Sequence, residues 1–244
     1  MNYIFLAAGK SSRIYKKIYK PKSLISLNNQ TLIESLLFKL KKKDRAYIIT
    51  GFQKEKIKKL FIKKCNIKYI YNKYYNSKDM LYSIYLSLKK VNGDVTISYT
   101  DITYEKKIFN CLNKYKNNIC IPVLKNWRKV WDIRKKNIFD DAENLEINIK
   151  DKCILSIGDY IKRKKIPRYQ FMGLVKIPNF YRKLLLKNFS NIFLKKKMQT
   201  TTFLNYLINR GVLIKYIPYN GKWFEFDDYN DFKIFKKKNK KFYN

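Results

Sequence analysis

Apolar and polar residues alternate along the chain with two periods, one typical of buried strands and one typical of helices. Short apolar runs predict strands over residues 3–7, 46–50, 67–71, 95–99, 169–177 and 212–217. Apolar positions at helical spacing predict helices over residues 31–42 and 54–63, from residue 79 onward, over 202–209 and after 231. This alternation predicts an α/β fold with a doubly wound, mostly parallel sheet and a ligand site at the carboxyl ends of its strands.

Two stretches refine the domain organisation. Thr31 and Glu34 form a capping box that opens the helix over residues 31–42. Between Trp127 and Ile157 the pattern changes to shorter β segments with polar breaks, which predicts a small β-rich lid or subdomain around residues 125–168. No internal repeat and no flexible linker divides the sequence, so we expect a single domain over residues 1–244.

A short polar loop follows the first strand. The strand ends in Leu6-Ala7-Ala8-Gly9, and Ser11, Arg13 and Pro21-Lys22 come next. Glycine lets the backbone approach a ligand, and successive backbone amides can then bind an anion. An ordinary turn after a strand is the alternative, but Arg13 and Lys22, the latter held by a rigid proline, favour the phosphates of a nucleotide.

Acidic side chains stand out because they are scarce, 18 against 55 basic residues. Asp101 directly follows the apolar strand over residues 95–99, at the edge where doubly wound folds place their ligands. Glu225, Asp227 and Asp228 form a second acidic cluster. Asp101 and Asp227 together could hold one Mg²⁺ that bridges phosphate oxygens, whereas a helix N-cap is the alternative for Asp101.

Aromatic and charged residues gather in a third segment, which contains Trp127, Trp131, Arg134, Asp141 and Glu143. Aromatic faces beside carboxylates hold an alkylammonium group through cation–π attraction. The alternative is that these tryptophans are core residues.

The formal net charge of +37 first suggests a nucleic-acid partner. However, lysine is spread along nearly the whole chain and is accompanied by abundant Asn, Ile, Tyr and Phe, which favours compositional drift. A nucleic-acid surface and attraction to a membrane surface are the alternatives. We expect no nucleic-acid partner.

Histidine is absent, which excludes Ser-His-Asp and Cys-His catalysis and any histidine-ligated metal. The four cysteines never form a CxxC pair, so we expect reduced, buried thiols. The first strand begins at residue 3 and no apolar run approaches 18 residues, so we expect a cytoplasmic protein without membrane insertion.

In this order, the motifs resemble those of a known superfamily. Leu-Ala-Ala-Gly-x-x-x-Arg over residues 6–13, Pro21-Lys22 and Ser-Tyr-x-Asp over residues 98–101 are similar to the nucleotidyltransferases with a Rossmann-like fold. The motifs over residues 127–143, 170–174 and 221–227 resemble a smaller branch of CTP-dependent cytidylyltransferases. That branch acts on 2-aminoethylphosphonate, phosphocholine or phosphoglutamine, in phosphonate or cell-surface polysaccharide synthesis.

The resemblance implies transfer of CMP from CTP to a small phosphorylated or phosphonylated amine, with release of pyrophosphate and Mg²⁺ as cofactor. It implies catalytic roles for Arg13 and Lys22 and metal binding by Asp101 and Asp227. The implied nucleotide-binding residues are Leu6, Ala7, Ala8, Gly9, Ser11, Arg13, Lys22, Asp79 and Ser83. The implied acceptor-binding residues are Trp127, Trp131, Arg134, Asp141, Glu143, Gln170, Trp223 and Glu225.

The sequence departs from the family pattern at two positions of the nucleotide site. Ser11 stands where the loop usually has a second glycine, and Asp79 stands where an asparagine is common. Two other functions stay open: a sugar-1-phosphate nucleotidyltransferase and a non-enzymatic, basic nucleic-acid-binding protein. A homodimer is left open as well.

Overall fold

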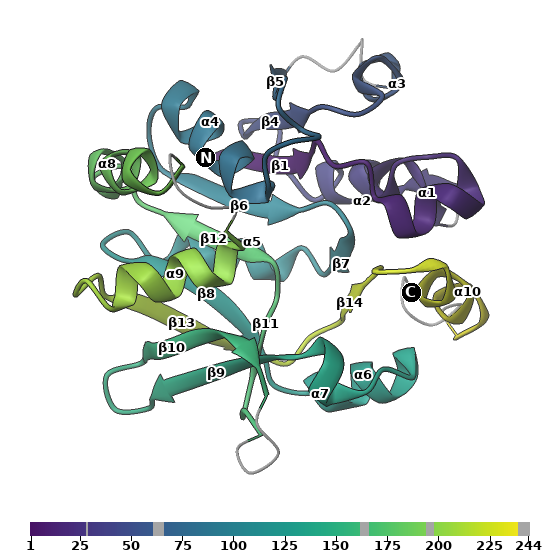
Figure 1. Cartoon of the computed structure of the whole chain (residues 1–244). Coiled ribbons are helices and arrows are strands. Elements are labelled where there is room, and N and C mark those ends of the chain that lie inside the picture. The colour runs from purple at the N-terminus through teal and green to yellow at the C-terminus, as the bar shows by residue number, and fades with distance from the viewer. Residues whose placement is uncertain (28, 61–65, 162–165, 194–197, 239–244) are drawn as a thin grey trace.

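A computed structural model describes residues 1–27, 29–60, 66–161, 166–193 and 198–238. Its centre is a ten-stranded sheet in the order β5-β4-β1-β6-β12-β8-β13-β10-β9, with β11 paired to β8 (Figure 1). The strands are β1 (Asn2–Ala7), β4 (Arg45–Thr50), β5 (Ile67–Tyr71), β6 (Val95–Tyr99), β8 (Ile119–Leu124), β9 (Glu143–Asn148), β10 (Cys153–Tyr160), β11 (Gln170–Phe171), β12 (Leu174–Ile177) and β13 (Ile214–Tyr219).

Helices cover both faces of this sheet. One face carries α4 (Met80–Lys90), α8 (Tyr181–Phe193) and α9 (Thr200–Ile208). The other face carries α1 (Ser12–Ile18), α2 (Leu32–Leu37), α3 (Lys54–Lys59), α5 (Lys107–Asn113), α6 (Trp127–Arg134), α7 (Ile138–Asp141) and α10 (Tyr229–Lys238). Within the described ranges, no helix is long and apolar enough to cross a membrane.

Strand β1 is buried on both faces, because its side chains alternate between two cores. Ile4 and Leu6 belong to the core under α4, whereas Tyr3 and Phe5 belong to the core on the opposite face. Strands β5, β4, β1 and β6 are parallel to one another, and β12 is antiparallel to β6. The predicted α/β fold with a doubly wound sheet is therefore confirmed, as is the capping box of Thr31 and Glu34.

A 3₁₀ helix and two small strand pairs lie outside this sheet but shape the site. The 3₁₀ helix η1 covers Lys22–Leu24, and β2 (Ser26–Leu27) pairs with β3 (Gln30–Thr31). Strand β7 (Ile102–Tyr104) pairs antiparallel with β14 (Trp223–Glu225). This last pair connects the end of β6 with the C-terminal part of the chain.

The prediction of short β segments from residue 127 onward was wrong at its start. Residues 127–134 form helix α6, because Trp127, Val130, Trp131 and Arg134 recur at helical spacing and are all buried. Strands β9 and β10 follow as predicted, but they extend the main sheet through the pair β10–β13. Closure of the region around residues 125–168 over the site stays a prediction, and residues 162–165 lie outside the described residues.

Two further boundaries differ from the expected pattern. Helix α1 begins at Ser12, immediately after the loop that follows β1, where only a polar loop was expected. The strand expected over residues 169–177 is split into β11 and β12 at Gly173, whose φ of +73° breaks the extended backbone.

Candidate nucleotide site

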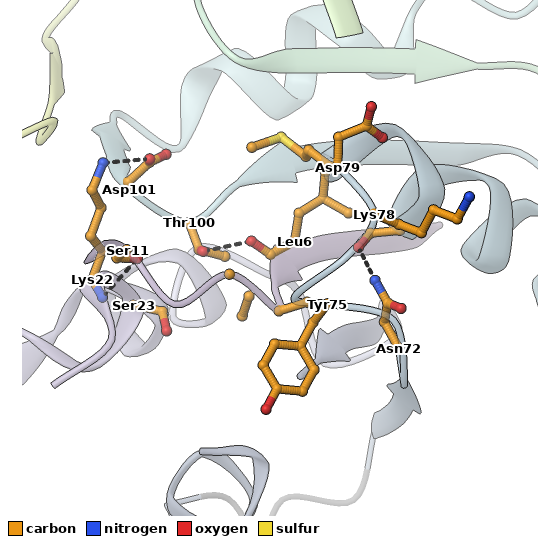
Figure 2. Close-up of a pocket in the computed structure, with 15 residues that line it drawn as sticks. Leu6, Ser11, Lys22, Ser23, Asn72, Tyr75, Lys78, Asp79, Thr100 and Asp101 are labelled. Carbon is orange, nitrogen blue, oxygen red and sulfur yellow. Dashed lines mark hydrogen bonds and ion pairs between the residues drawn. The ribbon is translucent and has the colours of Figure 1, made fainter. Parts of the chain in front are cut away.

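A pocket of about 190 Å³ lies at the carboxyl ends of β1, β5 and β6 (Figure 2). It is lined by Leu6, Ala7, Ala8, Gly9, Ser11, Lys22, Ser23, Asn72, Tyr75, Lys78, Asp79, Met80, Ser83, Thr100 and Asp101. The edge is the one that a doubly wound sheet offers to a ligand. Eight of these residues were among those that the resemblance implied for the nucleotide, and Asp101 was implied for the metal.

The loop after β1 leaves room for a ligand at Gly9. A β-carbon built on Gly9 would meet no heavy atom within 4 Å, so the space beside this backbone is open. Ser11 has a φ of +55°, the left-handed conformation in which glycine is favoured. Its side-chain oxygen accepts a hydrogen bond from the backbone N–H of Lys22 at 3.4 Å, which joins the loop to η1.

Lys22 lies between two carboxylates. Its Nζ is 3.1 Å from Oδ2 of Asp101 and 3.7 Å from Oδ1 of Asp227. Burial opposes a charge on Lys22, but Asp101, Asp227 and Glu225 outweigh it, so the pKa of Lys22 is raised. The lysine therefore stays a cation at the mouth of the Gly9 loop.

Backbone pairing brings the two aspartates together from opposite ends of the sequence. Glu225 of β14 pairs with Ile102 of β7, and the N–H of Phe226 donates to the carbonyl of Asp101 at 2.9 Å. Asp101 thus stands one residue before β7, and Asp227 stands two residues after β14. In the described part of the chain Asp101 caps no helix, so the N-cap alternative is excluded; the N-cap of α5 is Lys106.

Arg134 holds Asp227 from the side opposite Lys22. The guanidinium is fully buried, bonds Oδ2 of Asp227, and donates from Nε to Oδ1 of Asp231 at 3.1 Å. Its Nη1 lies 3.5 Å from carboxylate oxygens of both Asp141 and Glu225. Asp231 in turn accepts the backbone N–H of Asp227 at 2.7 Å, so the Arg134 cluster fixes both the side chain and the backbone of Asp227.

Two acids that contact Arg134, Glu225 and Asp227, have pKa values shifted in opposite directions. Burial and the neighbouring Asp227 raise the pKa of Glu225 well above its usual range, and Arg134 offsets only part of this. Burial would also raise the pKa of Asp227, but Lys22 and Arg134 outweigh it and hold that pKa below its usual value. Asp227 is therefore the carboxylate that stays ionised.

The donor set fits Mg²⁺ if phosphates complete it. Oδ1 of Asp101 is buried and has no hydrogen-bond partner among the described residues, so it remains an acceptor that a ligand could use. No group of three or more His, Cys, Asp or Glu in the described residues is arranged to hold a metal. Two carboxylates suffice for Mg²⁺ when the substrate's phosphate oxygens and water supply the remaining ligands.

Arg13 is exposed on α1 and, among the residues that the structure describes, has no ion-pair partner. Its charge nevertheless helps to lower the pKa of Asp227. An unpaired guanidinium near the site can bind a phosphate of the incoming nucleotide.

Asp79 has a structural role in this arrangement. It is the N-cap of α4, where its Oδ1 accepts the backbone N–H of Tyr82 at 3.3 Å. Its Oδ2 accepts the backbone N–H of Met198, just before α9. Both carboxylate oxygens are thus committed to backbone amides, and base reading by Asp79 stays a prediction.

The three tryptophans pack against each other. Trp131 stacks on Trp223 with ring centroids 6.0 Å apart, and Trp127 meets Trp131 edge-on at 5.4 Å. All three are at most 3% exposed. Arg134 packs against Trp131, with its guanidinium carbon 5.2 Å from the centre of the ring. The alternative, that these tryptophans are core residues, therefore describes this structure. Contact of these rings with the acceptor stays an untested prediction.

Glu143 and Gln170 lie together at the start of β9. The Gln170 amide exchanges hydrogen bonds with the backbone of Glu143 and is buried, so it ties β11 to β9. The Glu143 carboxylate accepts from the Thr201 hydroxyl at 2.9 Å. Burial raises the pKa of Glu143, and the hydrogen bond from Thr201 only partly opposes this.

Six pocket residues were missed in the sequence: Ser23, Asn72, Tyr75, Lys78, Met80 and Thr100. A signal was present for Asn72, which directly follows the predicted strand over residues 67–71 at the carboxyl edge of the sheet. Thr100 precedes Asp101 in the same position after β6, and its hydroxyl donates to the carbonyl of Leu6 at 2.8 Å.

A glycine loop follows the first strand of this doubly wound sheet, and a lysine held by two carboxylates lies next to it. This arrangement is typical of proteins that bind the phosphates of a nucleotide. Comparison with known proteins supports this class. The chain belongs to the MobA-like NTP transferase domain family, whose model matches residues 3–159, and is thus a nucleotidyltransferase.

Individual relatives cover nearly the whole chain. A CTP:phosphoglutamine cytidylyltransferase of Campylobacter jejuni is 27% identical over 96% of this chain and 98% of its own length. The solved CTP:phosphocholine cytidylyltransferase of Streptococcus pneumoniae has the same fold, with a TM-score of 0.73, 17% identity and 97% of each chain covered. The inositol-1-phosphate CTP transferase of T. maritima superposes with a TM-score of 0.72 at 18% identity, over 94% of this chain and 90% of its own.

Proposed function

We propose that this nucleotidyltransferase is a cytidylyltransferase, which transfers CMP from CTP to a small phosphorylated or phosphonylated amine and releases pyrophosphate. The observation that carries the proposal is Lys22, held between Asp101 and Asp227 at the end of the Gly9 loop. The similarity to the Campylobacter jejuni enzyme over nearly both full lengths supports CTP as the donor.

The reaction needs no general base in the protein. A phosphate or phosphonate oxygen of the acceptor is already anionic at neutral pH and attacks the α-phosphorus of CTP in line. The new P–O bond forms as the bond from the α-phosphorus to the oxygen bridging to the β-phosphate breaks, and pyrophosphate leaves with that electron pair. A chain without histidine is suited to such chemistry.

The site then acts by positioning the two substrates and by neutralising the charge of the triphosphate. Lys22 and Arg13 offset the negative charge of the triphosphate, and the backbone at Gly9 orients it. Mg²⁺, when held by Asp101 and Asp227, supplies further charge neutralisation on phosphate oxygens. Arg134 keeps the Asp227 carboxylate ionised and correctly turned.

The acceptor would bind on the side of the Arg134 cluster. Of the residues predicted for it, Asp141 and Glu225 keep side chains that are 22% and 24% exposed, and Glu143 is half-buried. Of these three acids, Asp141 and Glu143 can attract the amine of a zwitterionic acceptor, whereas the raised pKa of Glu225 favours its neutral form. These acids would then be held in position by the buried residues Trp127, Trp131, Trp223, Arg134 and Gln170.

A sugar-1-phosphate acceptor is the second candidate. A bifunctional protein GlmU of Methanococcus vannielii is 24% identical over 91% of this chain, although the match spans 51% of that protein. The non-enzymatic alternative predicted an acidic cluster far from the Gly9 loop, whereas Lys22 of the pocket contacts both Asp101 and Asp227.

Pyrophosphate release tests the proposal. The four ribonucleoside triphosphates are scanned with Mg²⁺ against 2-aminoethylphosphonate, phosphocholine, phosphoglutamine and sugar-1-phosphates. We expect release with CTP and one of the three amines. Release only with a sugar-1-phosphate would favour the second candidate, and no release with any pair would contradict both.

A further inference from the structure

The ammonium group of Lys22 lies between the two aspartates that are predicted to hold the metal. Its Nζ is 3.1 Å from Oδ2 of Asp101, a contact that Figure 2 shows, and 3.7 Å from Oδ1 of Asp227. Lys22 belongs to η1, whereas the aspartates follow β6 and β14, so three separate segments of the chain meet at this ammonium. The Lys22 side chain is 11% exposed, so the two carboxylates rather than solvent surround its charge.

Both carboxylate oxygens of Asp227 already face a cation. Its Oδ2 accepts from Arg134, which is fully buried and is also anchored by Asp231 at 3.1 Å. Its Oδ1 faces Lys22, whose ammonium has no ion-pair partner besides Asp101 and Asp227 among the described residues. Asp101 keeps one oxygen free, since its buried Oδ1 has no hydrogen-bond partner there. A cation held by both aspartates must therefore take Oδ1 of Asp227, and Lys22 is the group that can give way.

A divalent cation and this ammonium compete for the same carboxylates. Two positive charges in a partly buried site repel each other strongly, because little water screens them. A free Mg²⁺ ion also gives up its water reluctantly. A triphosphate changes both conditions, since its oxygens are ligands for the metal and a new anionic partner for the ammonium. Lys22 lines the pocket beside Gly9 and Ser11, so a phosphate bound at the Gly9 loop is a neighbour of its side chain.

We propose that Lys22 closes the metal site of the nucleotide-free protein and opens it when a triphosphate binds. Without nucleotide, its ammonium holds Asp101 and Asp227 and excludes a free divalent cation. With nucleotide, the ammonium moves from Asp227 to a phosphate, and the metal binds together with the triphosphate. Metal binding thus depends on the nucleotide. The inference rests on the proposed function, because it assumes that a nucleoside triphosphate occupies the pocket.

Metal binding without nucleotide tests the inference. Mn²⁺ is the probe, because the paramagnetic resonance signal of the free ion is lost when it binds. We expect weak binding to the wild-type protein and roughly tenfold tighter binding to Lys22→Met, in which the two carboxylates are released. Lys78→Met is the matched control, since Lys78 lines the same pocket but contacts neither aspartate. The control loses the same charge and should bind Mn²⁺ as weakly as the wild-type protein.

A second measurement uses the unchanged protein and decides the matter if Lys22→Met does not fold. The melting temperature of the wild-type protein is measured with Mg²⁺ alone, with CTP alone and with both. A ligand that binds only the folded state raises this temperature. We expect Mg²⁺ to raise it only when CTP is present. Equal Mn²⁺ affinity in the wild-type protein and a folded Lys22→Met variant, or stabilisation of the wild-type protein by Mg²⁺ alone, would overturn the inference.

The two proposals fail in different ways, because neither measurement contains an acceptor. If the wild-type protein transfers CMP but binds Mn²⁺ as tightly as Lys22→Met does, the inference falls and the function stands. If Lys22→Met gains Mn²⁺ affinity and Mg²⁺ stabilises the wild-type protein only with CTP, yet no acceptor gives pyrophosphate release, the function falls and the inference stands.

Discussion

Two glycines beside the nucleotide loop have opposite surroundings. A β-carbon on Gly9 would meet nothing within 4 Å, whereas one on Gly51 would lie 2.6 Å from the carbonyl oxygen of Ala8 and 2.5 Å from Cβ of Tyr75. Gly51 is thus needed so that the end of β4 can pack against the loop. We expect Gly9 to be needed only when a ligand is bound.

This difference predicts separable effects of two alanine substitutions. Gly9→Ala should leave the melting temperature unchanged and weaken CTP binding roughly tenfold or more, because the methyl group fills the space meant for the phosphates. Thermal unfolding and calorimetry with CTP measure the two quantities.

Gly51→Ala serves as the contrasting variant. Its methyl group must displace backbone, so we expect a loss of about 1–3 kcal/mol of unfolding free energy together with weaker binding. Equal CTP affinity in Gly9→Ala and wild type would show that the triphosphate does not approach this backbone.

At the scale of elements, helices α6 and α10 are joined by the ion pair of Arg134 with Asp231. Asp231 and Arg134 both have fully buried side chains. Removing the cation in Arg134→Met would leave Asp231 as an uncompensated buried charge, at a cost of about 3–5 kcal/mol of unfolding free energy. Denaturant unfolding measures this loss.

Lys136 provides the control for that substitution. It pairs with Asp228 at 2.6 Å, but the two side chains are 20% and 35% exposed. Lys136→Met should therefore cost only about 0–1 kcal/mol. A similar loss in both variants would mean that burial of the Arg134 pair has no special weight.

Lys39 lies two residues beyond the end of helix α2, where burial opposes its charge. Burial lowers the pKa of Lys39 to about 8, and its ammonium donates to the carbonyl of Ser35. Between pH 8 and the unfolded value near 10.5 the unfolded chain binds more protons, so this lysine makes stability rise with pH.

Lys39→Met should accordingly be more stable than wild type at pH 7, and its advantage should shrink as the pH rises from 8 to 10.5. Unfolding free energies of both proteins across this range test the sign. An advantage that grows with pH would contradict the assignment.

The elements also show what the sequence could predict. Strands over residues 67–71 and 95–99 were placed correctly, because buried strands have a clear apolar pattern. Helix α6 was missed because Arg128, Lys129 and Asp132 interrupt its apolar positions. The β7–β14 pair was beyond prediction, since it joins two three-residue strands about 120 positions apart through backbone bonds that leave no pattern.

For the whole molecule, the few acidic residues concentrate at the site. Of 18 acids in the chain, five lie around Arg134 and Lys22: Asp101, Asp141, Glu225, Asp227 and Asp231. We expect such a cluster of acids if compositional drift made the surface basic while the site kept its carboxylates. The scarcity of acidic residues is therefore a reason to single out Asp101 and Asp227 in the sequence. The acceptor-binding residues could not be derived in the same way, because the tryptophans that suggested them are buried.

The most direct test of the account compares two aspartates at opposite ends of β6. Asp101 follows the strand and contacts Lys22, whereas Asp94 precedes it and pairs with Lys176 at 3.0 Å. Both are replaced by alanine, and pyrophosphate release from CTP is measured with Mg²⁺ and the preferred acceptor, with circular dichroism as the check on folding. We expect Asp101→Ala to be folded but inactive, whereas Asp94→Ala still releases pyrophosphate. Wild-type-like activity in a folded Asp101→Ala protein would contradict it.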